Sequence, residues 1–286
     1  TKSQRSALDA QALLGVGTTR LEERVLASIG ALGAAAIRPE RVEDVPNAGV
    51  LCALPALLAL GLLRHSQTHF TLRPGFYPLE SIFLTMAFLA LARVPSLEAL
   101  RYEPQGEWGK ILGLDRLPEV KTLRHKLAEL SADGSKVRQW SATLSEEWMA
   151  AEEGCAGTLY IDGHVRVYHG SLTQLPRRYV ARQKLCLRGT TDYWVNAMDG
   201  RPFFVVTQTV DPGLIAVLEE SIVPRLLREV PGQPTPEELA ANPWRARFTL
   251  VFDRAGYSPQ LFRRLWALRI AVVTYHKFPG PAWAED

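Results

Sequence analysis

The spacing of apolar residues divides the chain into a helical first half and a second half rich in strands. In residues 119–130 the apolar positions recur every three or four residues, which is the period of an amphipathic helix. In the second half, short apolar runs are separated by turn signals such as Asp199-Gly200. The pattern therefore predicts a helical region over residues 1–153 and a core of mixed α/β or α+β class over residues 154–286.

The apolar runs and the turn signals define a specific order of elements. Helices are predicted over residues 19–37, 47–63, 79–92, 96–101, 119–130 and 136–153. Strands are predicted over residues 158–168, 183–187, 192–198 and 202–209, followed by helix 213–229, connection 230–247, strand 248–253, helix 258–268 and strand 270–275. The segments 47–63 and 79–92 are expected to be buried, because apolar stretches of this length form core helices more often than membrane spans.

The helical region contains a cluster with a basic last helix. Residues 96–100, 108–112 and 119–130 form three short helical segments, and the last of them carries Lys121, Arg124 and Lys126 outside its apolar stripe. A helix-turn-helix that binds DNA has this pattern, and so does an ordinary helical bundle with a solvated face. We expect this region to serve in DNA binding or dimerisation.

Charge becomes informative only when its distribution is considered. The chain has 33 Lys and Arg against 30 Asp and Glu, so its net charge of +3 does not by itself identify a nucleic-acid-binding protein. Between Gly163 and Thr191, however, there is no acidic residue. The basic residues of that stretch, which either follow a phosphate backbone or form a solvated face with an exposed loop, are Arg166, Arg177, Arg178, Arg182, Lys184 and Arg188.

Cysteine usage and the N-terminal residues indicate a soluble cytoplasmic protein without a membrane partner. Cys52, Cys155 and Cys186 form no CxxC pair, and we expect them to be reduced, buried thiols. The first five residues are polar and lack the apolar segment of a signal peptide.

Two aspartates stand in apolar, strand-forming runs and are the strongest chemical signal in the sequence. Asp162 lies in Tyr160-Ile161-Asp162-Gly163-His164, and Asp253 follows Phe248-Thr249-Leu250-Val251-Phe252. A carboxylate in such a run is unfavourable unless it is paired or binds a metal. The predicted order of elements is that of a ribonuclease-H-like sheet, in which these two strands are parallel neighbours, so both aspartates are expected to bind metal.

In these segments and several others, the chain resembles the DDE transposases of bacterial insertion sequences. The resemblance rests on the two aspartate runs, on Val167-Tyr168-His169-Gly170, on Thr190-Thr191-Asp192-Tyr193-Trp194 and on the helical stretch 113–124. It implies a ribonuclease-H-like catalytic core with two Mg²⁺ or Mn²⁺ ions held by Asp162 and Asp253. It also implies DNA cleavage and strand transfer at terminal inverted repeats, by a homodimer or larger assembly associated with the bacterial nucleoid.

The resemblance requires a third acid, a Glu on a helix beyond the last core strand. Glu285 is the only Glu after Tyr275 and follows Pro279-Gly280-Pro281, so we expect a terminal surface residue there and a chain truncated before the third acid. The leading hypothesis is therefore a DDE transposase whose activity in this chain is an open question. The alternatives are an inactive DNA-binding remnant or regulator, and another ribonuclease-H-like nuclease.

Residues next to the aspartates have both functional and structural interpretations. His164 shares a strand face with Asp162 and either contacts the scissile phosphate or packs within the strand. Arg254 either contacts phosphate or pairs with a surface acid. We expect Asp192 to be a turn or edge residue, and Trp194 and Trp244 to lie in a core or interface.

Overall fold

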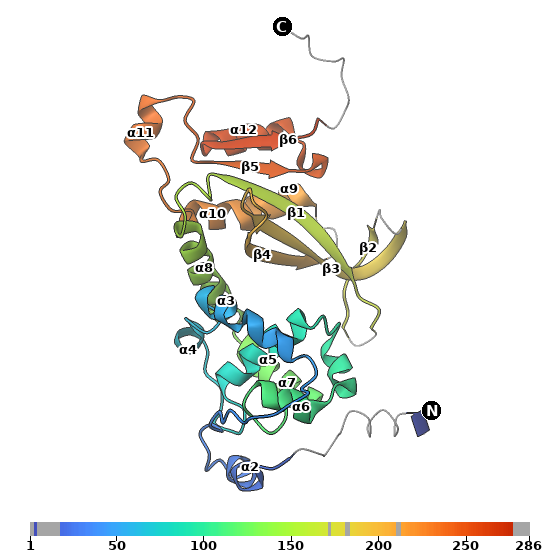
Figure 1. Cartoon of the computed structure of the whole chain (residues 1–286). Helices are drawn as coiled ribbons and strands as arrows, with labels where there is room; N and C mark the ends of the chain where they lie inside the picture. Colours follow the sequence, from blue (N-terminus) through green and yellow to red (C-terminus); the bar gives the residue numbers. More distant parts are fainter. Residues whose placement is uncertain (1–2, 5–17, 171–172, 181–183, 210–212, 277–286) are drawn as a thin grey trace. The chain divides into compact units, whose positions relative to one another are not determined.

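The chain folds into two compact units, Thr1–Trp140 and Ser141–Asp286 (Figure 1). The computed structural model describes residues 3–4, 18–170, 173–180, 184–209 and 213–276. Helix α8 (Gly134–Ala150) contains the boundary between the units. A helical first part followed by a mixed sheet with helices confirms the predicted fold class.

The first unit is built from short helices around one apolar core. Its largest fully buried side chains are those of Trp108, Phe88, Ile82, Leu100 and Leu123. Ile82 and Phe88 lie on one helix and the other three on three further elements, so the core holds the short helices together. The elements are α2 (Leu21–Ser28), η1 (Ala48–Ala53), α3 (Leu54–Ala59), α4 (Ser66–His69), α5 (Leu79–Leu91), η2 (Leu97–Tyr102), α6 (Gln105–Ile111) and α7 (Val120–Ser131).

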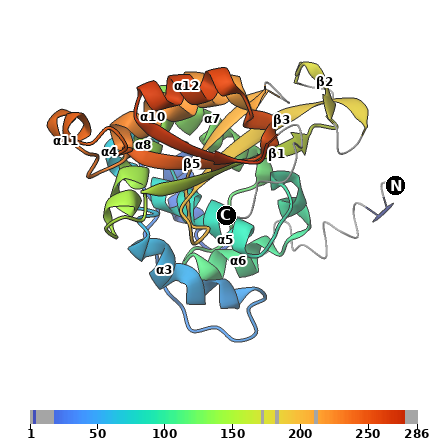
Figure 2. The same ribbon diagram turned by 90° about the horizontal axis from the view of Figure 1, so that it is seen from above.

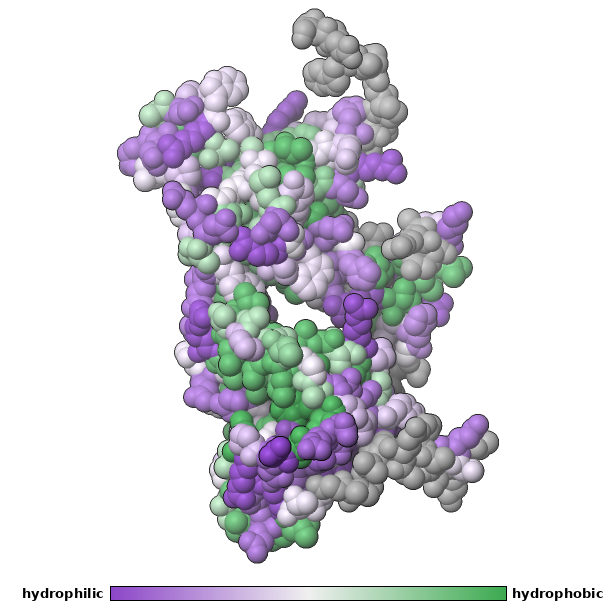
Figure 3. All heavy atoms as spheres, in the orientation of Figure 1, coloured by the Kyte–Doolittle hydropathy of each residue, from purple (hydrophilic) through white to green (hydrophobic). Residues whose placement is uncertain are grey.

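The prediction of a single buried helix over residues 47–63 is wrong. Residues Ala48–Ala53 form the 3₁₀ turn η1, and α3 begins at Leu54 with Pro55 in its first turn, so two short elements stand in place of one helix. Proline cannot donate the hydrogen bond that a continuous helix would require there. Leu51, Leu58 and Leu60 are exposed, and Figure 3 shows apolar side chains on this surface. The predicted helix over 19–37 likewise contains only α2.

The second unit contains a six-stranded mixed sheet. Its order is β2-β3-β1-β5-β6, with β4 also paired to β3. Strand β1 is antiparallel to β3 and parallel to β5, and β5 is parallel to β6. The strands are β1 (Thr158–Val167), β2 (Arg177–Val180), β3 (Leu185–Asn196), β4 (Pro202–Thr209), β5 (Phe248–Phe252) and β6 (Ile270–Thr274).

Helices cover one face of this sheet, as Figure 2 shows for α10 and α12. Leu218, Leu226 and Leu261 belong to the same buried cluster as Leu159 of β1 and Leu250 of β5. Side chains alternate between the two faces of a strand, so the residues between these core positions point the other way. The helices and turns are α9 (Leu214–Val217), the π-helical η3 (Leu218–Ile222), α10 (Val223–Glu229), α11 (Pro236–Ala241), η4 (Arg254–Gly256) and α12 (Pro259–Ala267).

Strand β3 corrects two predictions. The strands expected over 183–187 and 192–198 form one continuous strand, because Gly189 does not interrupt it. A Cβ on Gly189 would lie much closer than 3.0 Å to the carbonyl oxygen of Arg166, so the glycine permits a close approach of β1 and β3. Asp192 consequently lies inside β3, where it is buried, and is not a turn or edge residue.

Three smaller findings complete the comparison with the predictions. Helix α11 was not predicted within the connection 230–247, although Thr235 and Glu238 form a capping box at its start. Cys52 and Cys186 are exposed rather than buried. Among the described helices, none combines the length and apolar character needed to cross a membrane.

Candidate functional site

Asp162 lies within β1, and Asp253 directly follows the neighbouring parallel strand β5. Tyr160 is in register with Val251 and Ile161 with Phe252, so the next position on each chain is an aspartate. Ile161 and Phe252 are both buried on the helix-covered face. Because the side chains alternate, the two carboxylates belong to the opposite face, which we call the site face.

Local hydrogen bonds hold each carboxylate by a single oxygen. The backbone N–H of Gly163 donates to Asp162 Oδ1, and the N–H of Ala255 donates to Asp253 Oδ1, both over 2.9 Å. Thr274 of β6 donates its hydroxyl to the carbonyl oxygen of Asp253 over 3.0 Å. Both aspartates are exposed, and within the described ranges no residue donates to either Oδ2. Each side chain therefore presents one oxygen to solvent.

This pair fits a hard divalent cation. Mg²⁺ prefers oxygen ligands, keeps several waters and is commonly held by one or two carboxylates together with substrate phosphates. Across the described residues, no group of three His, Cys, Asp or Glu side chains is placed to hold a metal ion. A third acidic ligand is therefore not assembled in the described part of the chain, and Glu285 lies outside it.

Two expected neighbours lie beside the aspartates. His164 is exposed two positions after Asp162 on β1 and therefore shares the site face. Arg254 is exposed at the start of η4, directly after Asp253. Two of these four residues lie on β1 and two follow the end of the neighbouring β5, and they supply two carboxylates, one imidazole and one guanidinium.

The site face also holds a charged pair that was not predicted as functional. Asp192 of β3 is opposite His164, and its Oδ2 lies 2.5 Å from Arg166 Nε. Thr207 of β4 donates to Asp192 Oδ1 over 2.7 Å. The sequence signal for this cluster was the acid inside the β-branched and aromatic run 190–195, which a turn residue would not occupy.

Most of the basic stretch forms a hairpin that extends the sheet. Arg177 and Arg178 of β2 are exposed and pair in register with Arg188 and Leu187 of β3. Lys184 is exposed in the turn, with φ of 54°. Arg188 is six positions along β3 from Trp194, the register partner of Asp162, which corresponds to about 20 Å. Arg182 lies outside the described residues.

In the first unit, the three basic residues of α7 have different surroundings. Lys121 and Arg124 are exposed, and Arg124 pairs with Glu98. Lys126 instead donates to the carbonyl oxygen of Arg73 over 3.1 Å and is mostly buried. Helices α6 and α7 are joined by residues 112–119, a longer connection than the three- or four-residue turn of a helix-turn-helix.

An aromatic hollow of about 730 Å³ lies along α12 and β6. Its lining includes Thr274, whose hydroxyl bonds to the Asp253 backbone, together with several aromatic side chains. Trp244 is 84% exposed, so it does not lie in a core. The aromatic residues of the lining are Trp244, Tyr257, Phe262, Trp266 and Tyr275.

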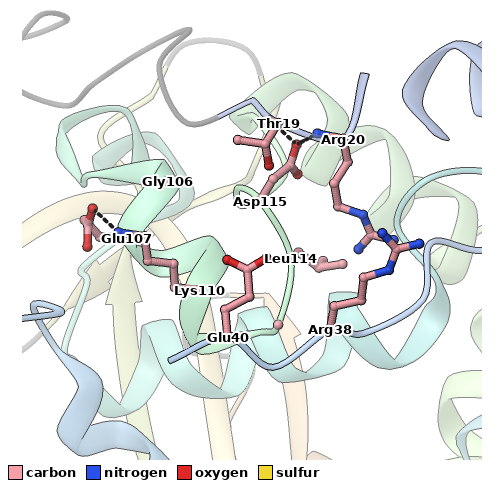
Figure 4. A pocket seen from close by; sticks show the side chains of 10 residues that line it. Thr19, Arg20, Arg38, Glu40, Gly106, Glu107, Lys110, Leu114 and Asp115 are labelled. Carbon is pink, nitrogen blue, oxygen red and sulfur yellow. Dashed lines mark hydrogen bonds and ion pairs between the residues drawn. The ribbon is translucent and has the colours of Figure 1, made fainter. Parts of the chain in front are cut away.

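The first unit has a polar hollow of about 440 Å³ beside Asp115 (Figure 4). The Asp115 carboxylate accepts from Arg24 Nε over 3.0 Å and from the backbone N–H groups of Thr19 and Arg20 over 3.3 Å each. Burial by itself raises the pKa of Asp115, but these hydrogen bonds outweigh burial and lower it below its usual value. Burial also raises the pKa of Tyr77, which hydrogen-bonds the carbonyl oxygen of Leu117. Asp115 is therefore a structural anion that anchors residues 19–24.

The second unit is thus an α/β domain with two adjacent exposed carboxylates on one sheet face. The sequence profile of the Transposase_29 family, described as "Transposase protein", matches residues 15–286. The chain belongs to this transposase family. No curated protein and no solved structure matches the chain.

Proposed function

We propose that this chain cuts DNA at the ends of a mobile element and joins the cut ends to target DNA, with divalent metal ions as cofactors. The observation that supports this most is the pairing of Ile161 with Phe252, since Asp162 and Asp253 are the residues that follow them. Strands β4, β3, β1, β5 and β6 also follow the order and directions of a ribonuclease-H-like sheet, which supports a DDE-type core. Membership of a transposase family supports DNA as the substrate.

The chemistry assigns different roles to the residues of the site. Two divalent ions, when bound, activate the attacking oxygen and stabilise the leaving oxygen of a phosphodiester. Asp162 and Asp253 would hold these ions through their carboxylate oxygens. His164 and Arg254 would orient the phosphate beside the carboxylates.

The reaction consists of two displacements at phosphorus. In cleavage, water attacks the phosphodiester at the element end and the bond from phosphorus to the 3′ oxygen breaks, leaving a free 3′-hydroxyl. In strand transfer, that hydroxyl attacks a phosphodiester of target DNA and a second 3′-hydroxyl leaves. A homodimer or larger assembly would bring two element ends together, while the basic hairpin and Lys121 and Arg124 would bind the DNA backbone.

The test is cleavage of duplexes that carry the sequences flanking the gene, in Mg²⁺ or Mn²⁺. We expect cleavage by the wild type and a loss of at least about 100-fold in Asp162→Asn and Asp253→Asn, the order of magnitude that a single stabilising group contributes at such centres. Glu220→Gln, a matched exchange at an exposed carboxylate of the same unit, should leave the rate unchanged. Full activity in Asp162→Asn would refute the site assignment.

The second candidate is a DNA-binding remnant or regulator that does not cut. It is favoured by the absence of a third acidic ligand near the pair in the described residues. Binding of the flanking duplexes by the wild type without cleavage in either metal would support this candidate over a transposase active in this chain.

A further inference from the structure

A buried carboxylate lies on the site face without belonging to the metal pair. The side chain of Asp192 is only 4% exposed, whereas that of its partner Arg166 is 64% exposed. Thr207 hydrogen-bonds the other oxygen of this carboxylate. Asp192 is therefore held from two neighbouring strands, while the charge that it pairs with stands at the surface.

Stability does not explain this arrangement well. A buried ion pair often stabilises a protein no better than apolar residues of the same volume, because both charges lose their hydration. A pair with one partner mostly in solvent gains still less from its Coulomb attraction. The arrangement does fix the direction of a guanidinium that would otherwise sample many rotamers.

The orientation leaves the outer edge of Arg166 available. The Nε atom lies against Asp192, and in the described part of the structure neither terminal nitrogen of Arg166 has a protein partner. A guanidinium presents paired N–H donors that match the oxygens of a phosphate. Fixing it through Nε lowers the entropy lost when it binds such a group.

Arg166 is also on the correct face for the DNA substrate. Arg166 lies two positions after His164 and four after Asp162 on β1, so all three side chains belong to the site face. Four residues of extended strand separate Arg166 from Asp162 by about 13 Å. At that distance it reaches a backbone phosphate beyond the one that is cut.

We propose that Arg166 binds a DNA backbone phosphate outside the cleaved bond and that Asp192 is its positioning residue. The location relative to the chemistry rests on the proposed function. The contact itself is independent of cleavage, because it requires only DNA binding. It distinguishes Arg166 from the other cations of the basic stretch, none of which is held by a buried carboxylate among the described residues.

The test measures DNA affinity by fluorescence anisotropy in EDTA, where no cutting occurs, over a series of salt concentrations. Arg166→Gln should weaken binding about five- to tenfold, as for a hydrogen bond to a charged group. It should also reduce the slope of log affinity against log salt by about one. Arg245→Gln, which removes an arginine paired with the exposed Glu238, is the matched control and should change neither quantity.

A double-mutant cycle tests the positioning role. Asp192→Asn should weaken binding in the wild-type background but add nothing in Arg166→Gln, because Asp192 acts only through Arg166. A purely structural role would weaken binding in both backgrounds. Unchanged affinity and salt slope in Arg166→Gln would overturn the proposal even if Asp192→Asn fails to fold.

The outcome is separable from that of the cleavage test. A protein that binds DNA through Arg166 but never cuts it would contradict the proposed cleavage and leave this inference standing. If instead the wild type cuts DNA and the Arg166→Gln variant binds DNA as tightly as the wild type, the proposed cleavage stands and this inference is refuted.

Discussion

Replacement of Asp115 by Asn should destabilise the first unit more than any exchange at an exposed acid. The carboxylate is inaccessible to solvent and receives two bonds from Arg24 in addition to two backbone N–H groups. An asparagine keeps the shape but loses the charge, and its amide N–H groups would face the N–H groups of Arg24. Residues 19–24 would lose their anchor to the loop before α7.

The magnitude follows from the surroundings of the pair. Removing one partner of a buried ion pair costs about 3–5 kcal/mol. Arg24 retains 23% exposure and can partly rehydrate, so the lower end of that range, about 3 kcal/mol at pH 7, is expected. The hydrogen bonds from the backbone would survive in part, because asparagine keeps one acceptor oxygen.

Hydrogen exchange measured by mass spectrometry is the appropriate assay, because the chain has two units. Peptides of α2 and α6 report on the first unit, and peptides of β1 and β5 provide an internal reference in the second. The control is Asp133→Asn, which removes an exposed acid that caps only its own turn at Ser135. Faster exchange in α2 and α6, with unchanged exchange in the second unit, is the expected result.

The stability difference between the wild type and Asp115→Asn should depend on pH in a defined direction. The pKa of Asp115 is lower in the folded protein than in the unfolded chain. Its stabilisation is therefore complete above the unfolded value of about 4 and is lost as pH falls through the folded value. The difference between wild type and Asp115→Asn should thus be constant from pH 8 to about 5 and shrink below it. A difference no larger than that of Asp133→Asn at pH 7 would refute the anchoring role.

Three further substitutions test the packing around the two sites. Gly109→Ala should lower the stability of the first unit by about 2 kcal/mol, because a Cβ would clash with the backbone of Arg116 and this overpacking exceeds the gain in helix propensity. Thermal unfolding measures the loss, with Gly134→Ala as the control, because a Cβ there meets only the tip of the Arg138 side chain. Gly163→Ala should cost about 1–2 kcal/mol and slow DNA cleavage, because the new methyl group would lie 3.0 Å from the ring of Tyr193 beside Asp162; equal cleavage rates would contradict this. Thr235→Ala should cost about 1 kcal/mol through loss of the capping box of α11, seen as faster hydrogen exchange there, with DNA cleavage unchanged.

The elements with a clear period were predictable, and those set by single backbone positions were not. Helix α7 and strands β1 and β5 follow from apolar spacing alone, because their buried residues repeat at the helix or strand period. Strand β3 was predicted as two separate strands, whereas Gly189 between them continues the strand and permits the close approach of β1. Residues 47–63 were predicted as one helix from their apolar pattern, but a new helix begins within them with Pro55 in its first turn.

In the candidate site, too, local sequence predicts some side chains and misses contacts between strands. Asp162 and Asp253 were recognisable because each interrupts an apolar run, and register then makes them neighbours. Asp192 was misjudged because one sequence does not reveal that its partners, Arg166 and Thr207, come from the strands on either side of β3. Pairing across strands joins residues that are 15 or more positions apart, so local sequence cannot specify it.

The alternation along β1 connects the stability of the second unit to its proposed chemistry. Leu159 and Ile161 are buried in the core, while Tyr160, Asp162 and His164 between them belong to the site face. A slip of β1 by one residue against β5 would turn Asp162 to the core face and expose Ile161, so burial of Ile161 beside Phe252 fixes the register of Asp162. The same packing that stabilises the sheet therefore bears on the spacing of the proposed metal ligands, and core substitutions in β1 should change metal affinity before they unfold the unit.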